Sequence, residues 1–365
     1  MRIMHISSAL TWRGGEQQIA YLIEGLSAQG IDSFVFCAAQ SAMEDHCKKY
    51  NIPFYIYVKR SGVSFSAARS LAKKAKQQQV DLIHLHDAHA HTYGVMAATF
   101  FGCNQKMVLS RRVDFPIKSS FLTQLKYNHS SIQKIICVSK FIENLVRKSV
   151  KRPERVLTVY SGIDSSKFAK SKTGKLRDLL YMNNENVLIG NIAALAPHKD
   201  HFTFVDACEK ILQKRPKIQF VIIGGDGGTK SSIEDYIDEK DLTDSIHLLG
   251  FRNDVSELIK DLDLFLFSSK TEGLGTSVID AMAAELPIVT TAAGGIPEII
   301  EHLKNGWLAK VGDAQMLAKG VLFALDHPKQ SGEWTDVGKR KLTNFDKKLV
   351  ASKTAEVYYS ILPKA

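Results

Sequence analysis

The sequence lacks any apolar run close to the roughly 20 residues that a membrane-spanning helix needs, so an integral helical membrane protein is not expected. Residues 1–6 lead directly into a strand-like apolar pattern, so we expect no secretory signal peptide. Repeats and low-complexity tracts are also missing. The 365 residues, of which 45% are hydrophobic and 24% charged, therefore predict a soluble globular protein with two domains.

Cysteine is scarce and shows no pairing. There are five cysteines, an odd number, at Cys37, Cys47, Cys103, Cys137 and Cys208. Their wide spacing matches neither a disulfide framework nor a metal-binding motif. We therefore expect buried thiols and a reducing, cytoplasmic compartment.

Positive charge is concentrated in one segment. The formal net charge is +10, and twelve basic residues against three acidic ones between Lys106 and Arg155 account for nearly the whole excess. A solvated basic face is one interpretation, and attraction to an anionic membrane on the inner face of the cell is another. A nucleic-acid surface is a third, but it lacks a motif and interleaved aromatic residues, so we expect no nucleic-acid partner.

Strand-like apolar runs alternate with amphipathic helical stretches along the chain. This alternation predicts an α/β protein with doubly wound parallel sheets. The expected strands are 2–7, 33–38, 54–58, 81–86, 106–110, 134–138 and 156–160, then 186–192, 217–223, 246–249, 264–267 and 287–291. Helices are expected at 16–29, 64–79, 140–150 and 339–362. Residues 161–164 break the pattern before a polar run, Ser165–Lys175, which predicts domains 1–164 and 165–344.

Two glycine loops stand beside each other in the predicted second sheet. The strand 264–267 leads through Glu272 and a loop with two glycines to a helix that opens at Thr276 or Ser277. The next strand leads to Gly294-Gly-Ile-Pro297, where the proline suits the first turn of a helix. Free amide groups and the positive end of a helix dipole attract anions. The pattern therefore predicts a phosphate site at the carboxyl ends of these strands.

Together these segments resemble the donor-site signature of glycosyltransferase family 4. The resemblance is carried by Glu272-Gly-Leu-Gly, Asp280-Ala-Met-Ala, Gly294-Gly-Ile-Pro-Glu298 and Asn305-Gly-Trp-Leu. It implies the GT-B fold, two Rossmann-like domains that face a cleft, with a C-terminal helix (about 345–365) crossing back to the first domain. It also implies a retaining hexosyl- or N-acetylhexosaminyltransferase that acts in bacterial surface polysaccharide or lipopolysaccharide synthesis on a glycan or lipid-linked acceptor.

The resemblance also assigns roles to particular residues. The expected catalytic residues are Glu272, Lys199, Arg112 and His86. Those expected to bind the donor are Gly14, Gly15, Arg111, Gly225, Phe251, Arg252, Gly273, Leu274, Gly275, Thr276 and Asp280. A nucleotide sugar, UDP-linked rather than GDP-linked, is the expected substrate, and neither a cofactor nor a metal ion is expected.

The sequence departs from the family pattern at two positions. Ala194 stands where an arginine that grips the diphosphate is usual, and Asp280 stands where a glutamate is usual. We expect Arg111 or Arg112, at the end of a strand, to supply the lost charge, with Arg252 as the other candidate. The loss also leaves open a catalytically silent partner of another transferase, and the fold leaves open a sugar-nucleotide epimerase.

Simpler interpretations of these residues remain. Gly14 and Gly15 can form a plain tight turn, Lys199 can be a surface lysine, and Arg111 and Arg112 can belong to the basic face. His84 and His86, followed by Asp87, His89 and His91, invite a metal site, as does the Asp261-Leu-Asp263 segment. Neither has the fixed ligand pattern of a metal centre, and we interpret Asp261 and Asp263 as the start of a strand.

Overall fold

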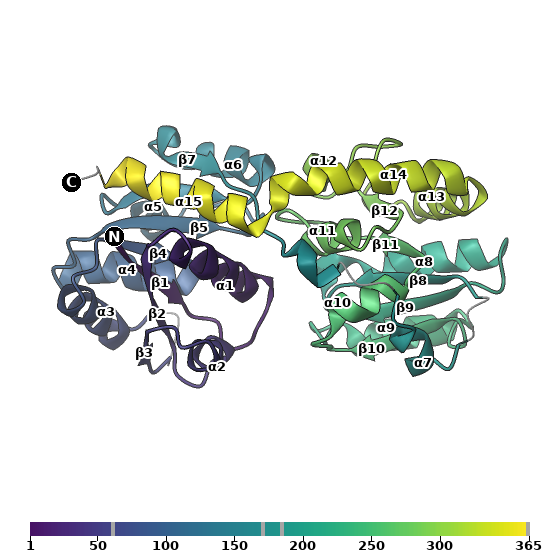
Figure 1. The fold of residues 1–365 in the computed structure, drawn as a ribbon, viewed down its shortest axis with the longest axis horizontal. Coiled ribbons are helices and arrows are strands. Elements are labelled where there is room, and N and C mark those ends of the chain that lie inside the picture. The colour runs from purple at the N-terminus through teal and green to yellow at the C-terminus, as the bar shows by residue number, and fades with distance from the viewer. Residues whose placement is uncertain (60–62, 169–171, 183–185, 363–365) are drawn as a thin grey trace. The chain divides into compact units, whose positions relative to one another are not determined.

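A computed structural model describes residues 1–59, 63–168, 172–182 and 186–362 (Figure 1). The chain separates into two compact units, which we call the N-terminal unit (Met1–Gly162 with Lys347–Ala365) and the C-terminal unit (Ile163–Asp346). The sequence placed the boundaries after residues 164 and 344. Part of the polar run predicted at Ser165–Lys175, residues 169–171, lies outside the described residues.

A parallel sheet forms the centre of the N-terminal unit. Its described strands follow the order β3-β2-β1-β4-β5-β6-β7, so the order reverses at β1 and the sheet is doubly wound. The strands are β1 (Arg2–Ser7), β2 (Asp32–Ala38), β3 (Phe54–Tyr57), β4 (Leu82–Leu85), β5 (Lys106–Arg111), β6 (Ile132–Cys137) and β7 (Val156–Thr158). In β4, every side chain is buried, as a parallel strand covered on both faces requires.

Helices cover both faces of this sheet (Figure 1). They are α1 (Gly14–Ser27), α2 (Ala42–Lys49), α3 (Phe65–Gln77), α4 (Ala88–Phe100), α5 (Phe121–Tyr127), α6 (Lys140–Arg147), the 3₁₀ turn η1 (Pro153–Arg155) and α15 (Lys347–Ile361). The C-terminal helix α15 packs against α1, where a Cβ on Gly25 would lie 2.3 Å from the Cβ of Ala351. The close approach explains the glycine, because any side chain there would push the two helices apart.

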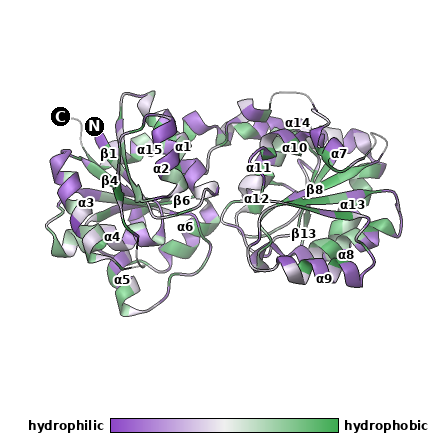
Figure 2. Cartoon of the chain, turned by 90° about the horizontal axis from the view of Figure 1, so that it is seen from below, coloured by the Kyte–Doolittle hydropathy of each residue, from purple (hydrophilic) through white to green (hydrophobic). Residues whose placement is uncertain are grey.

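The C-terminal unit repeats the design. Its described strands follow the order β10-β9-β8-β11-β12-β13, with the reversal at β8, and they are mainly hydrophobic in Figure 2. They are β8 (Leu188–Ile192), β9 (Gln219–Ile223), β10 (Ile246–Gly250), β11 (Leu264–Phe267), β12 (Ile288–Thr291) and β13 (Trp307–Ala309). Both units therefore confirm the predicted α/β class with doubly wound parallel sheets.

The α-helices described in the C-terminal unit range in length from 4 to 14 residues. The α-helices are α7 (Lys175–Leu179), α8 (His201–Leu212), α9 (Lys230–Glu239), α10 (Val255–Leu258), α11 (Thr276–Ala283), α12 (Ile296–Ile299), α13 (Ala314–Asp326) and α14 (Pro328–Lys341). The 3₁₀ turns are η2 (Ser165–Phe168), η3 (Pro197–Lys199), η4 (Ile259–Asp261) and η5 (Leu342–Phe345). As predicted, α11 begins at Thr276 and Pro297 lies in the first turn of α12.

Two local predictions were wrong. The helix expected at 339–362 is interrupted, because the backbone N–H of Ile163 donates to the carbonyl of Phe345 (2.7 Å) and Asp346 bridges to Ile163, so α14 and α15 separate there. Gly14 and Gly15 do not form a turn before the first helix, because they are its first two residues. The carboxylate of Glu16 accepts a hydrogen bond from the backbone N–H of Arg13 (3.1 Å), which starts the helix earlier than expected.

All five cysteines are buried free thiols, as predicted. Within the described residues, no helix is long and apolar enough to cross a membrane.

Candidate functional site

The loops that follow β8 and β11 bring a lysine and a glutamate together in the C-terminal unit. Lys199 ends the turn η3, and its Nζ lies 2.5 Å from Oε1 of Glu272, which follows β11. Only 19% of the lysine side chain and 10% of the glutamate side chain are exposed. The ammonium also lies 5.6 Å from the ring centre of Phe267. Lys199 is therefore a largely buried cation beside a carboxylate and not the surface lysine of the simpler interpretation.

Two serines fasten these loops to each other. The hydroxyl of Ser268 donates to the carbonyl of Asp200 (3.0 Å), and that of Ser269 donates to the carbonyl of His198 (3.0 Å). The backbone N–H of Lys270 donates to the same carbonyl of His198 (2.8 Å). Both neighbours of Lys199 in the chain are thus held by the segment that leads to Glu272, so the pair is positioned before any ligand binds.

The two predicted glycine loops pack against Glu272. Gly294 has φ +53°, and a Cβ there would lie 1.9 Å from the carbonyl oxygen of Glu272. The backbone N–H of Gly295 donates to this carbonyl (3.1 Å). Gly275 has φ +97° and precedes the first residue of α11, Thr276. Glycine is required at both positions, and it allows the segment Gly273–Thr276 to turn directly from Glu272 into the amino end of a helix.

The ends of β8, β9 and β10 meet beside this pair of loops. A Cβ on Gly224 would lie 1.9 Å from the carbonyl oxygen of Ala193, and the backbone N–H of Leu195 donates to the carbonyl of Gly225 (2.9 Å). Gly225 also lies against Phe251, a residue that is 65% exposed. Ala194, at the position of the expected arginine, is exposed. These loops form the edge at which the sequence predicted a nucleotide site.

Asp280 lies on α11 and is half-buried. Its carboxyl group accepts no hydrogen bond from the part of the chain that the structure describes. Burial raises the pKa of Asp280 to about 7, and the nearby charge of Lys167 opposes this shift. The carboxyl group is therefore poised to change charge near neutral pH and is available to a ligand.

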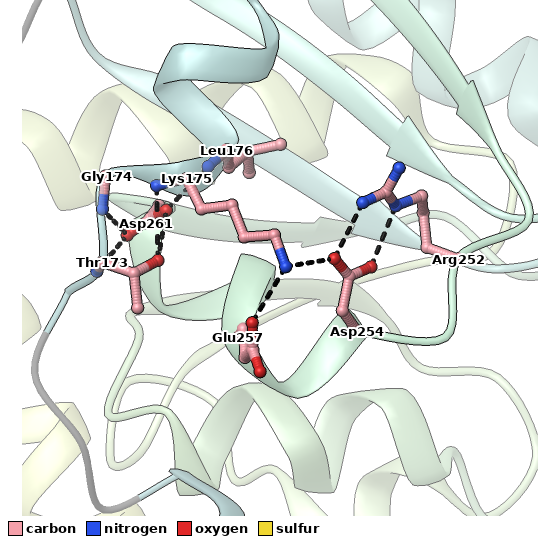
Figure 3. A network of polar contacts seen from close by, with 8 residues as sticks. All are labelled: Thr173, Gly174, Lys175, Leu176, Arg252, Asp254, Glu257 and Asp261. Carbon is pink, nitrogen blue, oxygen red and sulfur yellow. Dashed lines mark hydrogen bonds and ion pairs between the residues drawn. The ribbon is translucent and has the colours of Figure 1, made fainter.

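Arg252 is engaged by a neighbour, as Figure 3 shows. Its guanidinium donates two hydrogen bonds to the carboxylate of Asp254 (2.9 and 2.7 Å), and the same carboxylate lies 2.6 Å from Nζ of Lys175. These two cations hold the pKa of Asp254 well below its usual range. Arg252 is held by two hydrogen bonds to its carboxylate, whereas Lys199 makes one contact with Glu272, so the charge of Arg252 is the less available of the two to a phosphate.

Asp261 and Asp263 act as the start of β11, as interpreted from the sequence. Asp261 accepts hydrogen bonds from the backbone N–H groups of Thr173 (2.8 Å), Gly174 (2.9 Å) and Leu176 (2.8 Å), so it anchors the segment before α7 (Figure 3). Asp263 accepts from the cationic side chain of Arg177 (2.7 Å). Protein donors therefore use these carboxylate oxygens.

In the N-terminal unit, His5, His84 and His86 gather at the point where the strand order reverses. Nδ1 of His5 and Nε2 of His86 lie 3.0 Å apart, and the rings of His84 and His86 are 4.0 Å apart. The guanidinium of Arg112 contacts the carbonyl oxygen (3.1 Å) and Nδ1 (3.3 Å) of His86. Burial lowers the pKa of His5 to about 3 and those of His84 and His86 well below the usual value, so all three imidazoles are neutral.

One ring nitrogen of each of these three histidines lies within 4.8 Å of the others, but contacts inside the cluster and a neighbouring cation oppose a metal ion there. Nδ1 of His84 lies 2.5 Å from the hydroxyl of Tyr358, and its Nε2 lies 2.8 Å from that of Ser110, so both ring nitrogens are engaged. The positive charge of Arg112 beside His86 further opposes a metal ion. The other predicted members do not join the cluster: His91 pairs with the carbonyl of Lys126 (3.1 Å).

Arg111 and Arg112 have different surroundings. Arg111 donates to the hydroxyl of Tyr127 (2.9 Å) and to the carbonyl of Phe115. Arg112 contacts His86, and burial lowers its pKa to about 10, while the charge of Glu16 opposes that shift. Within the described residues, no carboxylate forms an ion pair with either arginine.

Sequence reasoning missed His5 and the role of Asp87. His5 belongs to an apolar strand and gave no motif, although the order reversal at β1 places it beside β4. Asp87 accepts hydrogen bonds from the N–H and the hydroxyl of Ser8 (both 2.6 Å) and from the N–H of His89 (2.9 Å), so it caps α4. An aspartate directly before a helical stretch is a recognisable capping signal.

Comparisons with known proteins agree with this architecture. The family described as "Glycosyltransferase Family 4" matches residues 12–167, and that described as "Glycosyl transferases group 1" matches residues 175–341. N-acetyl-alpha-D-glucosaminyl L-malate synthase of Bacillus anthracis is 25% identical over 310 residues, which are 81% of this chain and 78% of that one. UDP-Gal:alpha-D-GlcNAc-diphosphoundecaprenol alpha-1,3-galactosyltransferase of Escherichia coli is 21% identical over 342 residues, 89% of this chain and 88% of that one.

Among solved structures, Anabaena HepE in complex with UDP and glucose superposes with a TM-score of 0.85. It is 22% identical, and the match covers 99% of this chain and 100% of that one. Such a likeness bears on the fold, and it confirms the predicted GT-B architecture.

Proposed function

Because this chain belongs to the group 1 glycosyltransferases, with the GT-B fold, we propose that it transfers a sugar, with retention of anomeric configuration, from a UDP-sugar to a glycan or lipid-linked acceptor. The sugar is a hexose or an N-acetylhexosamine, and the product belongs to a bacterial surface polysaccharide or lipopolysaccharide. The relative named for UDP-Gal and a diphosphoundecaprenol acceptor and the HepE complex with UDP support this choice.

The buried pair of Lys199 and Glu272 is the observation that carries the proposal. A cation beside the amino end of α11 suits the two phosphates of a nucleotide sugar, because both present positive potential to the same place. The exposed ring of Phe251 and the carboxyl group of Asp280 offer an apolar contact and an acceptor for the nucleoside. These groups support a nucleotide sugar as the ligand of this site.

In the proposed reaction, Lys199 and the amides of Gly273–Thr276 stabilise the negative charge that develops on the leaving diphosphate. Glu272 accepts hydrogen bonds from hydroxyls of the donor sugar and fixes the orientation of its anomeric carbon. The acceptor hydroxyl attacks from the face that the phosphate leaves, and a phosphate oxygen takes the proton of that hydroxyl. His86 and Arg112 of the N-terminal unit are proposed to contact the donor sugar or its phosphates.

The segment Lys106–Arg155 is proposed to hold the enzyme peripherally on the anionic inner face of the cell membrane, where a lipid-linked acceptor would be found. We propose that neither a cofactor nor a metal ion takes part, because lysine and backbone amides can neutralise the leaving group.

One observation favours a second function. Ala194 removes a cation from the expected diphosphate contact, as in a catalytically silent partner that binds a nucleotide sugar for another transferase. Hydrolysis or transfer by the purified chain alone would count against this alternative. A sugar-nucleotide epimerase on the same fold would convert its donor without any acceptor.

A panel of nucleotide sugars, measured by thermal shift, tests the donor proposal. We expect UDP-sugars to raise the melting temperature more than GDP-sugars. In a Lys199→Ala variant, nucleotide sugars should no longer raise the melting temperature. Lys260→Ala is the control for loss of a lysine in the same unit, since Lys260 is buried on η4. A panel without any stabilising nucleotide sugar would contradict both the transferase and the silent-partner proposals.

A further inference from the structure

A cavity of about 460 Å³ opens in the N-terminal unit between α5 and η1. Its lining includes the apolar side chains of Phe121, Leu125, Ile132, Ile135 and Val150. Lys151, Arg152 and Arg155 line the same cavity. Figure 2 shows α5 at the margin of this unit. An apolar interior next to several cations is the arrangement that an amphiphile with an anionic group would fill.

The helix beside the cavity exposes its apolar side chains. None of the residues of α5 is buried, and Phe121 is 78% exposed, Leu122 75% and Leu125 53%. Phe115, just before this helix, is 63% exposed. A cluster of large exposed apolar residues on one short segment is typical of a surface that binds a membrane or another protein.

The cations beside the cavity lack acidic partners. In the described part of the chain, the side chains of Lys151 and Arg152 form no ion pair. Arg155 donates to the carbonyl of Ile132 (2.7 Å), and burial and the charge of Arg152 both lower its pKa. Glu154 is an acidic residue close to Arg155. Residues 115–142 of the sequence contain no acidic residue. The mutual repulsion of Arg152 and Arg155 would be relieved by a bound anion.

We propose that this region is a lipid site, at which Phe121, Leu122 and Leu125 enter an anionic phospholipid surface. One acyl chain occupies the cavity, and the headgroup phosphate lies on Lys151, Arg152 and Arg155. The inference rests on the membrane attachment proposed above and specifies it, because it requires apolar insertion as well as charge attraction. Stable attachment of a peripheral protein commonly needs two such contributions.

The salt dependence of vesicle binding distinguishes this lipid site from a basic face that is attracted to lipid by charge alone. Charge attraction at a surface is screened over about 8 Å at physiological ionic strength and over about 3 Å at 1 M. We therefore expect the purified chain to float with vesicles of phosphatidylcholine and phosphatidylglycerol at about 0.1 M NaCl. Part of this binding should persist at about 0.5 M NaCl. Complete release at the higher salt concentration would overturn the insertion.

Paired variants test the two halves of the site. The double variant Phe121→Ser, Leu122→Ser should lower vesicle partitioning at least tenfold, and so should Lys151→Gln, Arg152→Gln. All four side chains are exposed, so we expect both variants to fold. Two double variants in the same unit serve as matched controls. Phe65→Ser, Phe100→Ser also replaces two exposed apolar residues, and Lys73→Gln, Lys76→Gln removes two exposed charges from α3. These controls should change partitioning less than twofold.

A fluorescent probe measures insertion directly. Tryptophan emission of Phe121→Trp, after subtraction of the wild-type signal, should shift to shorter wavelength on binding and be quenched by phospholipids brominated along the acyl chain. Three outcomes would each overturn the lipid site. The first is that the Phe121→Ser, Leu122→Ser variant floats as well as the wild type, and the second is that no quenching occurs. The third is that the wild type binds pure phosphatidylcholine as well as it binds the anionic vesicles. Sugar transfer plays no part in these measurements, so a negative result would leave the transferase proposal standing.

Discussion

Nζ of Lys199 lies 2.5 Å from Oε1 of Glu272, although the two residues are 73 positions apart in the chain. Each side chain is largely withdrawn from water, so each charge depends on the other for compensation. A nucleotide sugar would enter this arrangement with phosphates for the lysine and hydroxyl groups for the glutamate. The pair is thus a preformed site whose two halves face different parts of the proposed donor.

Glu272→Gln should preserve the fold and lower transfer by more than tenfold, because the amide keeps the volume of the side chain but changes its hydrogen bonds to the donor sugar. The rate of transfer from the preferred UDP-sugar measures the effect, with Glu285→Gln, an exposed partner of Lys339, as the control. A variant that keeps more than about a tenth of the wild-type rate, a loss below about 1.4 kcal/mol, would show that Glu272 is not a key donor-site residue.

Asp280 predicts a pH dependence of stability and of donor binding. Its folded pKa of about 7 lies above the unfolded value of about 3.9, so its stabilising contribution is full below pH 4 and is lost as the pH rises through 7. Asp280→Asn should therefore stabilise the protein at pH 8 more than at pH 5, by on the order of 1–3 kcal/mol. Urea unfolding at both pH values measures this difference.

The carboxyl group of Asp280 should also make the affinity for a UDP-sugar rise between pH 6 and 8, because the ionised carboxylate is the better hydrogen-bond acceptor for the ribose hydroxyls. Calorimetric titration of wild type and Asp280→Asn across this range checks it. An identical pH profile in the two proteins would remove Asp280 from the donor site.

Three arginine variants test how the charge missing at Ala194 is replaced. We expect Arg111→Ala or Arg112→Ala to lower transfer at least tenfold, because no carboxylate is paired with either side chain in the described residues. Arg252→Ala should have a smaller effect, since its guanidinium already binds Asp254. Donor affinity and turnover are measured for each variant. If neither of the first two reaches tenfold, the compensation hypothesis fails.

Transfer should survive treatment with EDTA. The candidate site offers the ammonium of Lys199 and backbone amides to the leaving diphosphate, and the ring nitrogens of His84 are engaged by Tyr358 and Ser110. The rate before and after exhaustive chelation decides the matter. Activity that disappears with EDTA and returns with Mn²⁺ or Mg²⁺ would reopen a metal site at His84 and His86 or at Asp261.

Asp261→Asn should destabilise the C-terminal unit by about 3 kcal/mol, because a buried carboxylate that accepts three backbone hydrogen bonds is replaced by a group with an N–H₂ facing those donors. Chemical denaturation followed by circular dichroism measures the change. Glu257→Gln, which removes one exposed ion pair with Lys175, is the control and should change the stability far less than Asp261→Asn does, because water screens exposed charges. Equal stability of the two variants would contradict the anchoring role of Asp261.

The sequence by itself determined the local units of this protein. Apolar runs bounded by glycine and polar residues indicate which segments are buried strands. The alternation of strands and helices that builds both sheets was therefore predictable. Gly275 and Gly294 could be placed at strand–helix turns because glycine reaches backbone conformations that other residues avoid. Glu272 and Asp280 could be related to a donor site through a motif that lies within one strand–loop–helix unit.

The tertiary structure alone decided which distant groups meet. The periodicity of apolar residues indicates that a face is buried but not which residues cover it. It therefore could not predict that Tyr358 contacts His84, although the two are 274 positions apart. It also could not predict that His5 belongs to the same cluster. The break at Asp346 arises because the backbone there pairs with Ile163, which no local pattern records. Strand order sets these encounters, since it places the ends of β1 and β4 side by side although 74 residues separate the two strands.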